Sequence, residues 1–207
     1  MNVKLEHIGR RFNREWIFKE VDHSFEQGGS YAILGPNGSG KSTLLQIISG
    51  SLTPSEGSIT YSVNGTTVDV EDVFGHLSIA APYIELVEEF TLSELIDFHF
   101  RFKPYRDALD KAAVIDILGF NRSRHKAVKY FSSGMKQRTK LALAFCSATP
   151  LLMLDEPASN LDSSGIDWYL SLVESYSTGR TLIIGSNQEY EYSFCANLLY
   201  ISQYKNF

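Results

Sequence analysis

The sequence has little cysteine, no long apolar run and no excess of basic charge. Its 207 residues include two cysteines, Cys146 and Cys195. Each lies in an apolar stretch, so we expect buried free thiols, which suit a reducing compartment, rather than a disulfide. No apolar run approaches the ~18–20 residues that span a bilayer, and the N-terminal stretch MNVKLEHIGRRF lacks the apolar segment of a signal peptide. The net charge of −5 disfavours a nucleic-acid partner, which would require a basic face.

The order of apolar segments predicts an α/β core interrupted by a helical segment. Residues 31–34 and 151–154 are short apolar runs typical of buried strands. We expect one domain over the whole chain, with an α/β core of residues 1–84 and 149–207 and a helical subdomain of residues 85–148. Other expected elements are an edge strand at 3–7, a strand at 17–25, a hairpin at 57–70 with a tight turn at 64–65, a capping box at 91–94, and helices at 105–118, from 133 to about 149, and at 163–176.

A glycine-rich loop after the first buried strand has the pattern of a phosphate-binding site. GPNGSGKS, residues 35–42, matches G-x-x-x-x-G-K-[ST] and stands between a strand and a predicted helix, as that pattern requires. Glycines let backbone N–H groups curl around a β-phosphate, Lys41 brings a mobile positive charge, and the Ser42 hydroxyl can bind Mg²⁺. The alternative is a glycine-rich turn without a ligand. The expected nucleotide-binding residues are Asn37, Gly38, Ser39, Gly40, Lys41, Ser42 and Thr43.

Two acidic residues end the second buried strand. LLMLDE, residues 151–156, places Asp155 where a Mg²⁺ ligand is expected and Glu156 where a general base can polarise an attacking water. Pro157 follows, which suits a strand that stops and turns into a loop. The alternative is a charged turn at a strand end, which the phosphate-binding loop upstream makes the weaker interpretation.

A second candidate anion site lies nearly a hundred residues after the first. FSSGMKQR, residues 131–138, places two serines and a glycine before a predicted helix. Such a helix start offers backbone N–H groups and the positive end of the helix dipole to an anion. The alternative is an ordinary serine cap on a core helix.

Together these motifs resemble the nucleotide-binding domain of ATP-binding-cassette (ABC) transporters. GPNGSGKST, FSSGMKQR, and LLMLDEP followed by SNLD occur in the family's order and spacing over essentially the whole chain, and FSSGM is a degenerate form of the family signature Leu-Ser-Gly-Gly-Gln. The resemblance implies a P-loop NTPase core, a mixed sheet with antiparallel N-terminal strands, and an inserted helical subdomain. It also implies an ATPase that uses ATP and Mg²⁺ on the cytoplasmic face of a membrane, with an integral-membrane permease as partner and no nucleic acid.

The resemblance further implies that two cassettes, identical or not, pack head to tail. The signature helix of one then caps the γ-phosphate held by the other, which assigns Ser132 and Gly134 to the other cassette's ATP and Asp162 to the seam of the dimer. The family stacks an aromatic residue on adenine about 29 residues before the loop lysine, where Phe12 stands, with Trp16 as the alternative. The plainer interpretations are that Phe12 packs under the core sheet and that Asp162 caps a helix.

The chain departs from the family at two positions. The family has a glutamine between the phosphate loop and the signature, but no glutamine occurs between Gln46 and Gln137, and Pro82 stands at that position. The family ends its last core strand on a histidine, where this chain has Asn187, which can donate a hydrogen bond but cannot carry a charge. We therefore expect slow hydrolysis, with Glu156 as base. The alternatives are a weakly hydrolysing or regulatory cassette and a soluble ABC-type ATPase that acts on a non-membrane target.

A stretch of mixed acidic and apolar residues, 85–90, follows Pro82. In the family this region lies near the groove that receives a cytoplasmic helix of the membrane partner. It is either a docking surface or a solvated loop. The basic residues between 122 and 129 predict a solvated face rather than a nucleic-acid patch.

Overall fold

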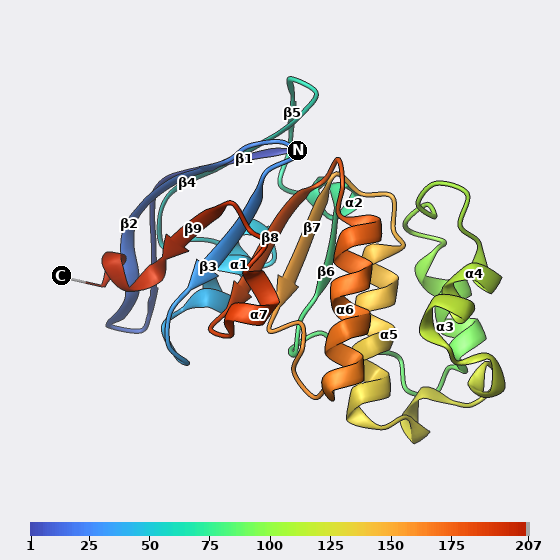
Figure 1. The fold of residues 1–207 in the computed structure, drawn as a ribbon. Coiled ribbons are helices and arrows are strands. Elements are labelled where there is room, and N and C mark those ends of the chain that lie inside the picture. Colours follow the sequence, from blue (N-terminus) through green and yellow to red (C-terminus); the bar gives the residue numbers. More distant parts are fainter. Residues whose placement is uncertain (206–207) are drawn as a thin grey trace.

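A five-stranded parallel sheet forms the centre of the protein. The computed structural model describes residues 1–205, shown in Figure 1. The strands lie in the order β6-β7-β8-β3-β9, and all four pairings are parallel. Their bounds are β3 Ser30–Leu34, β6 Leu77–Ala80, β7 Leu151–Asp155, β8 Thr181–Ser186 and β9 Asn197–Tyr200. The strands β7 and β8 are buried throughout, as expected for parallel strands covered on both faces.

The N-terminal strands form a second, antiparallel sheet with the order β2-β1-β4-β5. Its strands are β1 Asn2–Phe12, β2 Glu15–Phe25, β4 Glu56–Val63 and β5 Thr66–Val68. An apolar core of residues from β1, β2, β3 and helix α1 (Lys41–Ile48) joins the two sheets. The predicted fold class, with antiparallel N-terminal strands beside a P-loop core, is therefore confirmed, and these strands make a sheet of their own.

The first strand was wrongly expected at an edge. β1 pairs with β2 on one side and with β4 on the other. The alternation of Val3 and Leu5 breaks at His7, which has a positive φ of 50°, because the register shifts between Leu5 and Ile8 and returns Ile8 to the core. The remaining predicted strands and the 57–70 hairpin are confirmed, and Asn64 and Gly65 both have the positive φ of a type I′ turn.

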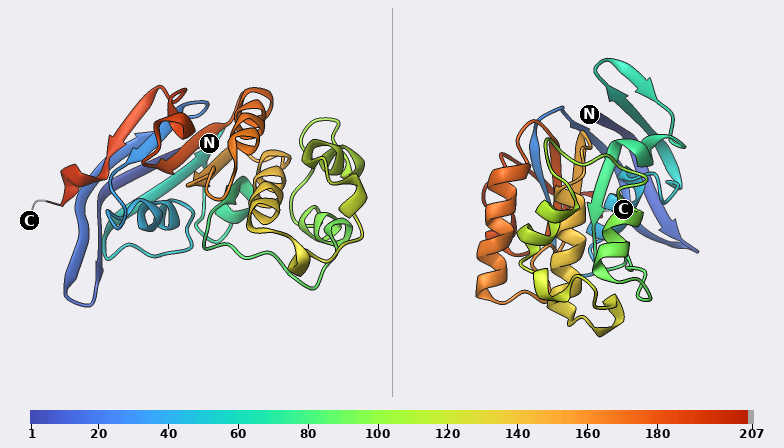
Figure 2. Two further views of the ribbon diagram at one scale, coloured as in Figure 1. Left: turned by 60° about the horizontal axis from the view of Figure 1, so that its bottom comes forward. Right: turned by 90° about the vertical axis from the view of Figure 1, so that its right-hand side faces the viewer.

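Helices α3 Leu92–His99 and α4 Lys111–Leu118 lie at the end of the molecule opposite the antiparallel sheet, as Figures 1 and 2 show. Thr91 and Glu94 form the predicted capping box at the start of one helix. Another helix, expected from residue 105, begins only at Lys111, because Asp110 caps it and Tyr105 instead stacks on Phe100. The division at residues 85 and 148 stays a prediction. The elements are α2 Val73–His76, α3 Leu92–His99, α4 Lys111–Leu118, α5 Ser133–Phe145, α6 Ser163–Tyr176, α7 Glu189–Tyr192, and the 3₁₀ turns Asn121–Ser123, Val128–Tyr130 and Ile201–Tyr204.

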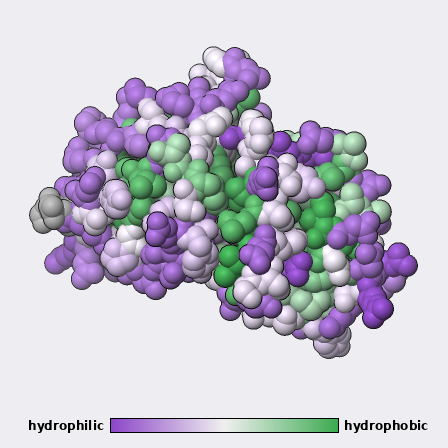
Figure 3. All heavy atoms as spheres, viewed as in Figure 1, coloured by the Kyte–Doolittle hydropathy of each residue, from purple (hydrophilic) through white to green (hydrophobic). Residues whose placement is uncertain are grey.

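The face that carries β9, α7 and α6 is apolar in its middle and polar at its margins. Figure 3 shows hydrophobic side chains over β9 and in the seam between α5 and α4, with hydrophilic side chains around them. β9 is the outer strand of the parallel sheet, and its Leu198 is exposed. Single exposed apolar residues of this kind are ordinary on a protein surface.

The buried Arg180 fixes the C-terminal end of α5 against the parallel sheet. Its guanidinium donates hydrogen bonds to the carbonyls of Ala144, Phe145 and Thr149, and to the hydroxyls of Ser78 and Thr149. A helix leaves its last carbonyls without partners, and a positive charge there also complements the helix dipole. The helix ends at Phe145 and not near residue 149, and the residues after it pair with residues 104–106 instead.

We predict that Arg180→Met lowers the free energy of unfolding by about 3 kcal/mol, since it leaves several buried oxygens unpaired. Urea unfolding monitored by circular dichroism measures the change. Arg122→Met, at an exposed position, is the matched control and should change stability by less than ~0.5 kcal/mol. Equal stability of the two variants would contradict this account of Arg180.

Candidate functional site

The carboxyl ends of three parallel strands lie level with one another. Leu34 of β3 is opposite Ser186 of β8, and Asp155 of β7 is opposite Gly185. The loops that follow these strands therefore meet at one edge of the sheet, where ligands of open α/β sheets are bound. The phosphate loop, Glu156 and Asn187 all lie in these loops.

The phosphate loop encloses a small cavity of about 200 Å³. All seven residues from Asn37 to Thr43 line it, together with Ile17 and Glu156. Gly40 precedes α1 with a φ of 105°, and no side chain caps the helix. A Cβ on Gly40 would lie 2.6 Å from Cγ2 of Ile17, so a larger residue would push the loop away from β2. The N–H groups at the start of α1 are thus open to an anion.

Lys41 folds back over the loop that contains it. Its ammonium group donates hydrogen bonds to the carbonyls of Gly35 at 2.8 Å and Pro36 at 3.3 Å. The hydroxyl of Ser39 is buried and, within residues 1–205, has no hydrogen-bond partner. A positive charge and an unpaired donor thus both lie at the loop.

Asp155 is a buried carboxylate whose two oxygens make no hydrogen bond to any described residue. It is 1 % exposed. Burial raises the pKa of Asp155 to about 6, and Glu156 adds to the rise, whereas Ser42 and Lys41 nearby oppose it. An unpaired carboxylate beside a hydroxyl is an oxygen donor set that fits Mg²⁺, so Asp155 and Ser42 suit the predicted metal site.

Glu156 has the left-handed backbone conformation, with a φ of 44°. Its N–H donates a 2.8 Å hydrogen bond to the carbonyl of Gly185, which holds the turn against β8. This conformation is strained for a residue other than glycine, and such strain concentrates at functional sites. It accompanies the placement of Glu156 in the wall of the phosphate-loop cavity.

Asn187 reaches the phosphate loop from the end of β8. Its side-chain amide donates a hydrogen bond to the Asn37 side-chain oxygen at 3.0 Å. The sequence predicts that Asn187 takes the place of the family's histidine, and the structure brings it to the loop. The contact joins two neutral groups, so it supplies no positive charge there.

The signature residues lie around a different cavity, of about 360 Å³. Ser132 and Gly134 line it together with Asp162, and none of the described residues lines both this cavity and that of the phosphate loop. The plainer interpretations also hold, because Ser132 caps α5 through the Met135 N–H and Asp162 caps α6 through the Gly165 N–H. One chain thus has two candidate anion-binding surfaces that do not share a residue.

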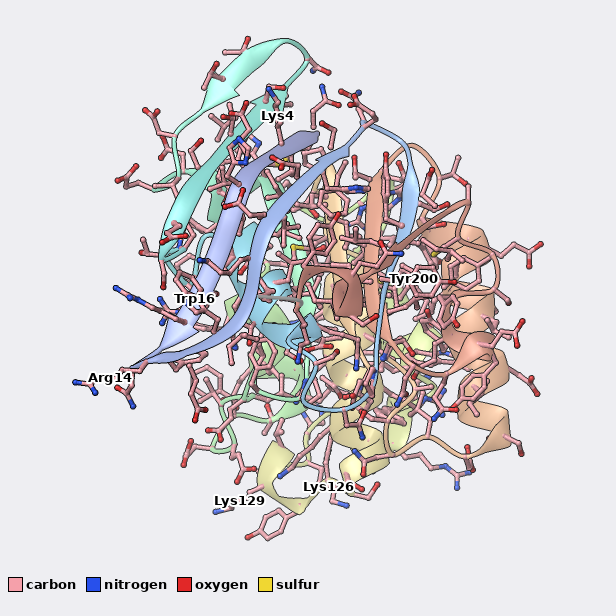
Figure 4. The ribbon with its side chains drawn as sticks, turned by 90° about the vertical axis from the view of Figure 1, so that its left-hand side faces the viewer. Lys4, Arg14, Trp16, Lys126, Lys129 and Tyr200 are labelled. Carbon is pink, nitrogen blue, oxygen red and sulfur yellow. The ribbon has the colours of Figure 1, made fainter. Side chains whose placement is uncertain are left out.

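The two aromatic candidates lie on neighbouring strands near the turn that joins β1 and β2. The register shift between Arg10 and Arg11 interrupts the alternation of β2, and Ile17 and Phe18 both lie against Gly40. The Lys19 ammonium and the Arg11 guanidinium lie over the ring of Trp16. Figure 4 shows Trp16 near the tip of the hairpin, close to Arg14. Phe12 pairs with Glu15, and the Arg10 guanidinium lies over its ring. Phe12 is 46 % exposed, so it does not pack under the core sheet.

At the position of the missing glutamine, Pro82 follows β6 and lies close to the acidic residues. Ala80 is opposite Leu154, so residues 81–83 run beside Asp155 and Glu156. Burial raises the pKa of Tyr83, and the nearby charge of Asp155 raises it further. Lys140 of α5 donates hydrogen bonds to the carbonyls of Ala81 and Pro82. Sequence analysis missed Tyr83, Ile17 and Lys140, because none of them belongs to a contiguous motif.

We predict that Asp155→Asn stabilises the metal-free protein at pH 7.5 by up to about 3 kcal/mol, since the folded-state pKa is raised by about two units. Between pH ~4 and ~6 the folded wild type holds a proton that the unfolded chain has lost. The free energy of unfolding of the wild type therefore rises as the pH falls from ~6 to ~4. Below pH ~4 the wild type and Asp155→Asn should be equally stable. Urea unfolding in a chelator at several pH values measures this.

The exposed Asp167→Asn is the control and should show no such gap. If Asp155→Asn and wild type differ in free energy of unfolding by the same amount at every pH from 4 to 7.5, the pKa of Asp155 is not raised.

Comparisons with known proteins agree with this arrangement. Residues 18–159 match the family described as "ABC transporter". The chain is 30 % identical over 187 residues to the ABC transporter ATP-binding protein YcbN of Bacillus subtilis, with 89 % of this chain and 61 % of that protein covered. It is 30 % identical over 191 residues to the lantibiotic transport ATP-binding protein SrtF of Streptococcus pyogenes, with 89 % and 80 % covered.

The fold is that of a solved cassette. The dimeric structure of MJ0796, titled a bacterial ABC transporter cassette, superposes with a TM-score of 0.80 at 22 % identity, over 96 % of this chain and 94 % of that one. The family match, SrtF and the geometry of the phosphate loop lead to one conclusion. The chain belongs to the ABC transporter family, as an ATP-binding cassette.

Proposed function

We propose that the chain is the ATP-hydrolysing subunit of a membrane transporter and that ATP closes a dimer of two cassettes. The observation that carries the proposal is the separation of the two candidate anion-binding surfaces within one chain. A triphosphate held at the phosphate loop leaves its γ-phosphate exposed on one side. Ser132 and Gly134 of a second cassette, at the start of α5, can enclose it with N–H groups and a helix dipole.

The residues of the phosphate-loop cavity have distinct roles in this proposal. Lys41 and the N–H groups of residues 38–43 bind the phosphates. Ser42 and Asp155 would hold Mg²⁺, which neutralises charge that develops on the phosphates. Glu156, in the cavity wall, accepts the proton of the attacking water. Phe12, which is 46 % exposed, contacts adenine, and Trp16 is the alternative. Asp162 lies at the dimer seam beside Ser132.

Turnover should be slow, because two groups of the family's machinery are replaced. Asn187 contacts Asn37 as a neutral donor. Such a bond contributes about 0.5–1.5 kcal/mol, against ~1.5–3 for a bond to a charged group. Pro82 has no side-chain donor or acceptor with which to orient water. A regulatory cassette without useful turnover is the alternative that these two replacements favour.

An apolar groove of about 390 Å³ offers a docking site for the permease. Phe74 of α2, Phe98 of α3 and Phe102 lie along it, and Phe74 and Phe102 are each 61 % exposed. Glu85 and Lys140 are also in its lining, so a helix with an apolar face and charged ends would fit. We propose that a cytoplasmic helix of the permease binds there and holds the cassette on the cytoplasmic face of the membrane.

Within residues 1–205, the structure has no helix with the length and apolar character to cross a bilayer.

We predict that Glu156→Gln lowers steady-state ATP turnover by about 10²-fold or more, with little change in ATP affinity, because it removes the base but keeps the side-chain volume. In Mg-ATP the variant should remain a dimer by light scattering, since closure no longer ends in hydrolysis. The exposed Glu174→Gln is the matched control. Unchanged turnover in Glu156→Gln would refute its role as base, and a monomer in saturating Mg-ATP would refute the shared site.

We predict that Phe102→Ser weakens binding to native membrane vesicles stripped of peripheral proteins by about tenfold or more, with basal ATPase unchanged, as expected for a central aromatic contact. Co-sedimentation measures the affinity. Leu198→Ser, at an exposed apolar position on β9, is the matched control. Equal binding to protein-free liposomes would favour the lipid surface over a permease as the binding partner. No binding to native vesicles would favour a non-membrane target.

A further inference from the structure

Glu191 is a buried acid in α7 that none of the steps above uses. It is 2 % exposed. Burial raises the pKa of Glu191, the hydrogen bonds from Ser186 and Ala158 oppose the rise, and the nearby carboxylates of Glu156 and Asp155 add to it. A buried carboxyl group is costly unless its oxygens are paired, so the partners of Glu191 indicate why it is there.

The two oxygens of Glu191 have partners in different parts of the chain, one in the loop after β7 and one at the end of β8. One oxygen accepts a hydrogen bond from the Ala158 N–H at 2.7 Å. The other accepts a short hydrogen bond from the Ser186 hydroxyl, whose oxygen in turn accepts one from the Gln188 N–H at 2.9 Å. The carboxylate therefore bridges the loop after β7 and Ser186, the last residue of β8, from which the next loop begins.

These two loops contain the residues placed around the γ-phosphate. Ala158 is two residues after Glu156 in the loop that leads to Asp162, and Ser186 immediately precedes Asn187. The backbone of Glu191 is held as well, because its carbonyl accepts a 2.8 Å hydrogen bond from the buried hydroxyl of Tyr169 in α6. Glu191 is thus anchored to a core helix while its side chain joins the loop after β7 to the end of β8.

We propose that Glu191 is a positioning residue that holds Glu156 and Asn187 in one mutual arrangement for the reaction at the γ-phosphate. This inference rests on the proposed function, since it assigns Glu156 and Asn187 their roles in hydrolysis. Glu191 itself touches neither nucleotide nor water in this scheme. Its loss changes where the two loops lie, and a displacement of about 1 Å at a reacting group can cost on the order of 10²-fold in rate.

The chemistry of the bridge predicts how two substitutions differ. A glutamine can accept from the Ala158 N–H with its oxygen and donate to the Ser186 oxygen with its amide, so it keeps the bridge. An alanine leaves the Ala158 N–H and the Ser186 hydroxyl buried without this partner. If Glu191 acted only through its charge, glutamine could not take over its function. If Glu191 acts as a bridge, glutamine can.

The first test is steady-state ATPase of the purified chain. Glu191→Ala should lower kcat about tenfold to 10²-fold and leave the ATP dissociation constant within about twofold, because the phosphate loop is untouched. Glu191→Gln should keep kcat within about threefold of wild type. Glu189→Ala, an exposed acid in the same helix, is the matched control. An unchanged kcat in Glu191→Ala, or an equal loss in Glu191→Gln, would overturn the proposal.

The second test is amide hydrogen exchange in the absence of nucleotide, which does not depend on turnover. Glu191→Ala and Ser186→Ala should both speed exchange in residues 157–162 and in 186–190 together, while Glu189→Ala leaves both segments unchanged. If Glu191→Ala does not fold, Ser186→Ala alone gives the answer. Exchange that rises in only one segment, or across the whole chain, would overturn the proposal. If the wild type shows no ATPase turnover, the proposed function is refuted. Amide hydrogen exchange would still test whether Glu191 joins the two segments.

Discussion

The level register of the parallel strands β3, β8 and β7 is the constraint on which the candidate site depends. Because Leu34 is opposite Ser186 and Asp155 is opposite Gly185, the three loops that follow begin at the same height. A shift of one residue in this register would turn the strand-end side chains to the other face of the sheet. The buried apolar residues of β7 and β8 prevent such a shift, since it would exchange their positions in the two cores that flank the sheet.

Two buried carboxyl groups, those of Asp155 and Glu191, lie at this edge of the sheet, and burying a carboxylate lowers the stability of the folded state. Asp155 has no hydrogen-bond partner among the described residues, whereas Glu191, a few residues beyond β8, has a partner for each oxygen. The difference fits their proposed roles. A carboxylate meant for a cation is left unpaired, and binding of the cation then stabilises the folded state by mass action. A carboxylate meant to join two loops must instead be paired in the resting protein.

The sequence predicts those parts of the site that are contiguous in the chain. The phosphate loop, the Asp155-Glu156 strand end and the helix caps at Thr91 and Ser132 follow from local rules about backbone and side-chain hydrogen bonds. The short strand β9 was missed because its pattern is weak without the neighbouring β3. The Glu191 bridge spans 33 residues to Ala158, and no local signal marks a contact of that kind.

Helix α5 connects the proposed docking groove to the loop around Pro82, the position of the missing glutamine. Lys140 lines the groove and also donates to the carbonyls of Ala81 and Pro82, while Lys136, one turn earlier in α5, forms an ion pair with Glu88. Both lysines belong to the helix whose first turn carries Ser132 and Gly134. A partner that fills the groove therefore acts on the same rigid helix that would cap the other cassette's ATP. In the proposed cycle, a permease helix in the groove would therefore contact the helix that completes the second cassette's nucleotide site.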